Sequence, residues 1–456
     1  MHGQNRTWDE GRLSASISRY DSSMKLVKEL NLSEGGRMYS GAYWDFRKIG
    51  NKYWFICAAY ERTRNSPTLT AIEVNPSTLE TAPPKLLAAG SDIDLKLSFF
   101  NGITSWNIFC KTSPNGKHTS LCIFEGDNFF VCSLDENLDL EWKKRETEDI
   151  SKVYIKSTEI DNAGNIYFAY VHDEEGHLII CTKEKKHLDK ILHLKEGKPI
   201  NIQLLSNKKG DAVTIAGTYQ SDHDRITGVF KTQIGVGSSS IRTASIMPVP
   251  DSTVARFKED GWRMSKKNDF LRLDIKLLQM DDENIVLTGE FREEREGSKA
   301  YRKFYLSGSI LVAFLDEKQA SFARVPKARI STVYLTGDSY FVHPYRNQLI
   351  IFYNDYPAHL KRDLSKSAEE ANNYKNTALI AAVVNRTGPV QRQVVIDKSA
   401  EDYMSIPEDM QSPANNVVEV PLVKMGAVKG VDKDAMMIGK IVVAGEAGGL
   451  GKLSNN

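Results

Sequence analysis

A strand–turn–strand unit recurs seven times along this chain of 456 residues. In each copy an apolar, β-rich run meets a short polar turn and then resumes, a pattern typical of a β-hairpin. The copies begin at Ser16, Thr70, Phe129, Leu178, Thr227, Leu311 and Leu379. Seven copies of one hairpin predict an all-β repeat fold.

A second pair of strands precedes six of these hairpins. Their connecting turns contain Gly and Asn, which adopt the positive φ that tight turns require. The turns are KIGNKY, SPNGKH, DNAGNI, SNKKGD, MDDENI and PYRNQL. Each complete unit is therefore expected to be a sheet of four strands.

The hairpin near Ser16 has no strands before it, and two unpaired strands remain at the other end of the chain. These are the runs that begin at Val417 and Met436. A sheet assembled from both ends would close a ring of sheets and leave no open edge. We therefore expect the C-terminal strands to pair with the N-terminal hairpin.

Units of four antiparallel strands that close end to end resemble the β-propellers as a class. The copies are spaced by roughly 50 to 80 residues, longer than WD40 blades, and they lack the WD40 and kelch signatures. The resemblance implies one seven-bladed propeller domain over residues 1–456, with no narrower family. The expected blades are 10–34 with 415–445, then 38–90, 98–147, 150–196, 199–246, 270–328 and 332–398.

Long segments are expected on only one face of such a propeller, the face of the second-to-third-strand loops and of the blade connections. They follow Ala88, Phe291 and Tyr353, and the longest blade connection runs from Ile246 to Asp269. Function commonly lies on loops that a rigid scaffold carries, so this is the candidate binding face. The alternative is neutral insertion, because surface loops lengthen at little cost in free energy.

Several side chains on that face have the chemistry of a binding site. Arginine binds carboxylate or phosphate in a bidentate manner, although the interleaved Asp and Glu residues could neutralise these arginines instead. Trp262 either plugs the channel or stacks on a ligand. The acidic turns around His172 and His223 are read as solvated turns, and we expect no metal site. The candidate binding residues are Arg64, His172, His223, Arg225, Trp262, Arg263, Arg295 and His359.

Composition excludes some functions. The net charge of +1 does not favour nucleic acid or an anionic membrane as a partner. No apolar run is long enough for a spanning helix.

The five cysteines match no zinc pattern. We expect them to be buried free thiols, with a Cys122–Cys132 bridge as the alternative.

No catalytic motif occurs in the chain, so catalytic residues stay unknown. We therefore expect a monomeric module, without a cofactor, that binds a protein, a peptide or a glycan. The alternative is a hydrolase or lyase that acts on a polysaccharide at the channel mouth, because paired carboxylates leave no local motif. The compartment is left open: cytoplasmic, or extracytoplasmic if a signal peptide has been removed.

Overall fold

The computed structural model describes most of the repeat region, and the statements below concern these residues alone. They are 7–9, 12–14, 16–21, 26–31, 44–61, 66–89, 107–125, 128–147, 155, 157–184, 187–221, 226–238, 240–259, 273–280, 284–296, 303–327, 329–332, 340–360, 370–371, 377–397, 403–407, 410–424 and 436–443.

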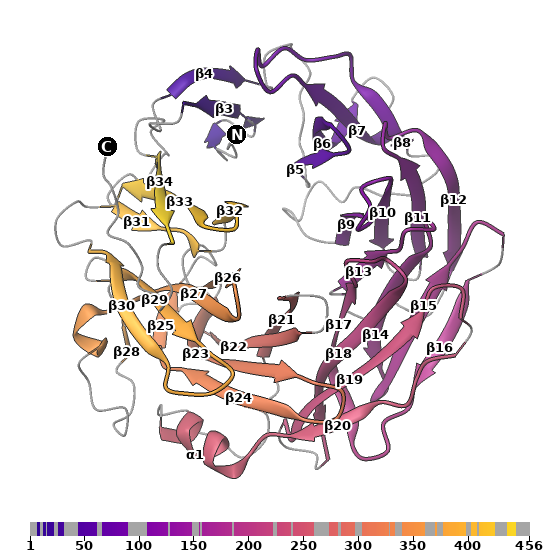
Figure 1. Cartoon of the computed structure of the whole chain (residues 1–456). Helices are drawn as coiled ribbons and strands as arrows, with labels where there is room; N and C mark the ends of the chain where they lie inside the picture. The colour runs from indigo at the N-terminus through magenta and orange to yellow at the C-terminus, as the bar shows by residue number, and fades with distance from the viewer. Residues whose placement is uncertain are drawn as a thin grey trace. The chain divides into compact units, whose positions relative to one another are not determined.

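Seven sheets of at least four strands follow one another along the described chain, and their strands pair in an antiparallel manner except for one parallel pair in the fifth sheet (Figure 1). In the first four sheets each strand pairs with its neighbour in sequence. Their strands are β5 (Trp44–Ile49), β6 (Lys52–Glu61), β7 (Ser66–Val74), β8 (Lys85–Ala89), β9 (Asn107–Thr112), β10 (His118–Glu125), β11 (Asn128–Asp135), β12 (Leu140–Thr147), β13 (Ser157–Ile160), β14 (Ile166–His172), β15 (Glu175–Cys181), β16 (Leu188–Leu192), β17 (Lys198–Ser206), β18 (Ala212–Gln220), β19 (Gly228–Gly235) and β20 (Ser245–Pro248).

The fifth and seventh sheets are less regular than the others. The fifth has six strands because β25 and β28 join it, and in the seventh, which has four strands, β33 pairs with all three of the others, whereas the sixth has four strands in simple order. Their strands are β21 (Leu273–Gln279), β22 (Ile285–Glu296), β23 (Lys303–Leu315), β24 (Ala320–Val325), β25 (Arg329–Thr332), β26 (Tyr340–Tyr345), β27 (Gln348–Asp355), β28 (Glu370–Ala371), β29 (Ala378–Val384), β30 (Gln391–Ile396), β31 (Tyr403–Ser405), β32 (Gln411–Ala414), β33 (Val417–Lys424) and β34 (Met436–Val442). The all-β fold of seven sheets that the repeats predict is confirmed.

The seventh sheet differs from the one that the sequence predicts. The central strand β33 pairs with β34 along one edge, and it pairs with β31 and β32 along the other. Both edges of β33 are thus used by C-terminal strands, two of which come from a segment that the sequence left unassigned. The N-terminal strands β1 (Thr7–Asp9) and β2 (Arg12–Ser14) form a separate two-stranded sheet.

The hairpin of β3 (Ser16–Tyr20) and β4 (Leu26–Asn31) also forms a sheet of its own. The structure therefore does not show the predicted pairing of this hairpin with the C-terminal strands. Instead Ile17, which has no exposed surface, packs with Phe55 and Val74 of the first four-stranded sheet. Lys28 also donates a hydrogen bond of 2.5 Å to the carbonyl of Thr78. The hairpin is thus stabilised by face-to-face packing.

Apolar side chains from neighbouring sheets form the core. One cluster joins the sheets β5–β8 and β9–β12, and a second joins β9–β12 to β13–β16. Two further clusters join the fifth sheet to the sixth and the sixth to the seventh. Such burial is the main favourable contribution to folding.

The five cysteines are free and buried, as predicted. Cys122 pairs with Val131, and Cys132 pairs with Leu121. The two thiols therefore belong to the core clusters on opposite faces of one sheet, which rules out a bridge between them. Burial raises the pKa of Cys110 to about 11 and that of Cys181 to about 12, so both are protonated at neutral pH.

The chain divides into two compact units, each described here by itself. The first unit comprises Met1–His193, Ile202–Ile215 and Thr232–Thr243, and the second comprises Leu194–Asn201, Ala216–Lys231 and Ala244–Asn456. The helices within the described residues are α1 (Asp251–Glu259) and the short 3-10 helix η2 (Pro357–Leu360). No helix in the described ranges has the length and apolarity to cross a bilayer.

Candidate functional site

Three insertions of the second unit join in an extension of the fifth sheet. β22 and β23 continue past Phe291 as a paired hairpin as far as Glu296 and Lys303. β25 pairs with β23, and β28 runs parallel to β25. We call these residues, 292–296, 303–307, 329–332 and 370–371, the insertion sheet.

Two of these segments differ from their expected form. The segment after Phe291 is an ordered hairpin rather than an irregular loop, because its strands stay paired and gain β25 as a third strand. In the long segment after Tyr353, which was also expected to be a loop, Glu370–Ala371 is a strand because it pairs with β25.

A buried ion pair lies where the insertion sheet leaves its blade. Lys327, between β24 and β25, donates to the carboxylate of Glu290, and neither side chain has exposed surface. The Lys327 ammonium also lies 3.3 Å from the hydroxyl of Ser307. The register of β22 shifts immediately after Glu290, as at a β-bulge that redirects a strand.

Arg392 of β30 connects this ion pair to the neighbouring sheet. One guanidinium nitrogen donates to the carbonyl of Pro326 at 3.2 Å, and the other donates to the carbonyl of His359 at 3.1 Å. The hydroxyl of Tyr353 lies 3.3 Å from the same Pro326 carbonyl. Burial and the nearby Asp355 carboxylate raise the pKa of Tyr353, so its hydroxyl stays protonated and donates.

Asp355 and His359 complete the network at the end of β27. One Asp355 carboxylate oxygen accepts the backbone N–H of Tyr356 at 2.7 Å and lies 2.9 Å from Nδ1 of His359. The Tyr356 ring is perpendicular to the imidazole at 5.2 Å. We call Glu290, Ser307, Lys327, Tyr353, Asp355, His359 and Arg392 the buried polar network. It is the candidate functional site, because buried charges are costly unless paired and concentrate at functional sites.

The sequence-predicted binding residues are described only in part. His359 belongs to the buried polar network, at the predicted connection between the second and third strands of its sheet. Arg295 pairs with Phe304 in the hairpin of the insertion sheet. Arg64, His223, Arg225, Trp262 and Arg263 lie outside the described residues.

His172, in the first unit, lies at a tight turn. It pairs with Glu175, and the two residues between them have positive φ angles of 46° and 68°. Nε2 of His172 lies 3.8 Å from the carboxylate of Asp173. The solvated acidic turn predicted there agrees with this geometry. The role of these residues in binding stays a prediction.

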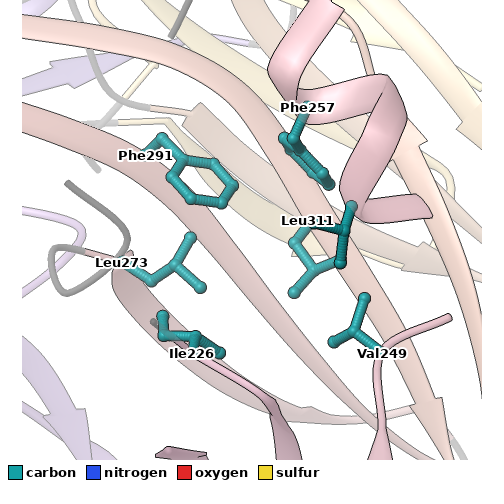
Figure 2. A pocket seen from close by; sticks show the side chains of 7 residues that line it. Ile226, Val249, Phe257, Leu273, Phe291 and Leu311 are labelled. Carbon is teal, nitrogen blue, oxygen red and sulfur yellow. The ribbon is translucent and has the colours of Figure 1, made fainter. Parts of the chain in front are cut away.

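The blade connection after Ile246 contains helix α1, which covers a small apolar pocket (Figure 2). Phe257 points from the helix toward Phe291, Leu273 and Leu311, and its ring centroid lies 4.6 Å from that of Phe291. The enclosed space is about 10 Å³, at the lower limit for one water molecule. This pocket is therefore a packing gap and not a ligand site.

The sequence did not reveal most of the buried polar network. Lys327 follows a Val-Pro pair, Arg392 lies in the last strand of the repeat that begins at Leu379, and Glu290 lies near the end of an apolar run. The one local signal was the spacing of four residues between Asp355 and His359, which lets the two side chains meet across the short turn after β27. In the described part of the chain, no three His, Cys, Asp or Glu side chains gather as metal ligands do.

Comparisons with known proteins add only distant structural likeness. No family model matches the sequence, and no curated protein matches it. The uncharacterized protein lmo1340 from Listeria monocytogenes EGD-e is similar in structure, with 10% identity and a TM-score of 0.41 over 83% of this chain and 91% of that one. The β-propeller domain of the Trilobed protease from Pyrococcus furiosus has 10% identity and a TM-score of 0.35 over 90% and 82%. The Dos1 propeller has 10% identity and a TM-score of 0.37 over 74% and 72%.

Such low scores carry no argument, so the classification rests on the sheets themselves. Each of the seven has an antiparallel core of four strands, and the seven sheets follow one another along the chain. The chain is therefore an all-β protein of the seven-bladed β-propeller class.

Proposed function

We propose that this propeller is a binding module for a protein, a peptide or a glycan. Its ligand would contact the second unit beside the insertion sheet and the buried polar network. One observation carries the proposal: three insertions from separate parts of the chain pair in one sheet, and paired buried charges lie directly beside it. Insertions that drifted neutrally would not be expected to pair with one another. Binding roles are also proposed, each within its own unit of the chain, for the remaining sequence-predicted residues, which are Arg64, His172, His223, Arg225, Trp262, Arg263 and Arg295.

The test is a variant that lacks the tip of the insertion sheet. Residues 293–306 are replaced by a two-residue turn, which leaves Glu290 and Ser307 in place. Wild type and variant are compared on peptide and glycan arrays, and circular dichroism verifies that the variant folds. The matched control is Asn51→Ala in an exposed short turn. We expect binding to be lost in the deletion variant and kept in the control. Equal binding by the deletion variant would contradict the proposal.

A second candidate is a hydrolase or lyase acting on a polysaccharide, which the Asp355–His359 pair favours. A carboxylate that binds Nδ1 orients imidazoles that act as general bases. The distinguishing measurement is turnover. Release of reducing ends from a polysaccharide by wild type, with none from His359→Ala, would favour the enzyme. Saturable binding without product would favour the module.

A further inference from the structure

We propose that Nε2 of His359 is the atom that contacts the ligand, as a hydrogen-bond acceptor, and that the ligand is a neutral carbohydrate. This inference rests on the proposed binding function and specifies its ligand class. Two observations support the inference. They are the hydrogen bonds that the other polar atoms of His359 form, and the contacts that Arg392 and Lys327 make within the protein.

The position of the imidazole proton follows from Asp355. The Asp355 side chain is 1% exposed, and a carboxylate can only accept hydrogen bonds. Nδ1 of His359, at 2.9 Å, must therefore carry the proton. In a neutral imidazole this leaves the lone pair on Nε2, so that Nε2 accepts a hydrogen bond.

Nε2 is open to a ligand. No described residue forms a hydrogen bond with it, whereas Nδ1, the backbone N–H and the carbonyl of His359 all have partners. The side chain keeps 10% of its surface exposed. In other proteins a carboxylate that binds one imidazole nitrogen orients the ring so that the other nitrogen can bind a partner. Asp355 and Nδ1 of His359 are arranged in the same way.

The described charges nearby do not favour an anionic ligand. Arg392 donates to the carbonyls of Pro326 and His359. Lys327 is fully buried against Glu290. Both cations are thus engaged within the protein, and a carboxylate or phosphate would meet the carboxylate of Asp355 behind the imidazole. A neutral hydrogen-bond donor suits this site better.

A sugar hydroxyl fits the open acceptor. A hydroxyl that donates to Nε2 can turn its lone pairs toward water. The half-buried ring of Tyr356 and the half-buried Pro357 lie beside His359. They provide an apolar surface of the kind that can pack against the C–H face of a sugar ring.

The test measures the binding of defined oligosaccharides by calorimetry. The neutral probes are cellohexaose, xylohexaose, mannohexaose and N-acetylchitohexaose, the anionic probe is hexagalacturonate, and the peptide probe is hexaalanine. We expect at least one neutral probe to bind. His359→Ala should weaken it about tenfold, the cost of one hydrogen bond. Asp355→Asn should also weaken the binding of this probe, because an amide no longer fixes the proton on Nδ1 of His359. The matched control is His193→Ala, because His193 is exposed.

A second readout does not depend on the variants. The nitrogen-15 resonance of Nε2 in the wild type should be that of an unprotonated nitrogen, and it should shift when the neutral probe binds. Equal affinity of wild type and His359→Ala for a probe, with no shift of Nε2, would overturn this inference and leave the proposed binding function standing. Binding of only hexagalacturonate or hexaalanine, or of no probe, would also overturn it. The proposed function fails separately, when the arrays detect no ligand that depends on the insertion sheet.

Discussion

Lys327 donates a hydrogen bond to the carboxylate of Glu290 at a position where neither side chain has any exposed surface. Removing both charges from water costs several kcal/mol, and their attraction offsets this cost only when the geometry is good. Lys327 also lies two residues after the end of β24 and two residues before the start of β25. The pair therefore lies where the chain passes from the blade into the insertion sheet.

The first prediction concerns loss of one partner of this pair. Lys327→Met removes the cation that lies against the buried Glu290 carboxylate, so the free energy of unfolding should fall by about 3–5 kcal/mol. The double variant Lys327→Met, Glu290→Leu should recover much of this loss, because no buried charge remains. Urea denaturation measures both. If the single variant is as stable as the wild type, the pair does not have the energetic role assigned to it.

The second prediction concerns the short turns of the first unit, which are linked through Asn162. Its side-chain oxygen accepts the backbone N–H of Asn115 at 2.9 Å, and its side-chain nitrogen donates to the carbonyl of Lys209 at 2.7 Å. Asn162→Ala removes both bonds and should cost about 1–2 kcal/mol of unfolding free energy. Hydrogen exchange should accelerate at the N–H of Asn115. The exposed Asn51, whose change to Ala should alter stability little, is the control.

Much of the fold could be predicted because its signals are local. The turns after Ile49, Ser113 and Asp161 are recognised from Gly and Asn near their centres, and Gly50, Gly116 and Gly164 do adopt positive φ. The composition of the seventh sheet could not be predicted in this way. β31 and β32 are short, and they become strands only because β33 offers each of them part of one edge.

The candidate site was predictable only at His359. Its companions Glu290, Lys327 and Arg392 are distant in sequence and meet through tertiary structure. Each alone is an ordinary charged residue, and the sequence contains no sign that two of them are fully buried. The insertion sheet could not be predicted either. Its strand β25 pairs with β23 although β24 lies between them in sequence, and β25 also pairs with β28, which comes from a third segment.

The third prediction concerns pH and His343 of the second unit. Nδ1 of His343 lies 2.8 Å from the hydroxyl of Ser412, and Nε2 lies 2.9 Å from the carbonyl of Asn415. Burial lowers the pKa of this imidazole from its usual 6.5, although the Asn415 carbonyl opposes the shift. Below about pH 6.5, His343 therefore binds a proton more readily in the unfolded chain than in the folded protein.

It follows that His343 contributes stability that is present above about pH 6.5 and is lost as the pH falls toward the folded pKa. Urea midpoints measured between pH 7.5 and pH 5 should decrease for the wild type. They should decrease less for His343→Gln, whose amide can keep one of the two hydrogen bonds. The same pH slope in both proteins would show that other groups cause it. His193→Ala, which changes an exposed histidine, should keep the slope of the wild type.

The fourth prediction concerns the packing of helix α1 on the fifth sheet. Phe257 is 2% exposed, and with Val254, one turn earlier, it lines the apolar pocket shared with Leu311. The guanidinium of Arg324 lies 5.9 Å from the Phe257 ring. Phe257→Ala should therefore lower the unfolding free energy by about 3–5 kcal/mol, through lost burial and the cavity that remains.

The same change should free the helix before the sheet unfolds, because Phe257 and Val254 are the α1 residues that line the apolar pocket. Limited proteolysis should then cleave between Asp251 and Glu259 faster than in the wild type. Arg256→Ala, an exposed position on the same helix, should leave both stability and cleavage nearly unchanged. Unaltered cleavage of Phe257→Ala would mean that backbone contacts at the ends of α1, such as that between Val249 and Thr227 at 3.0 Å, are enough to keep the helix in place.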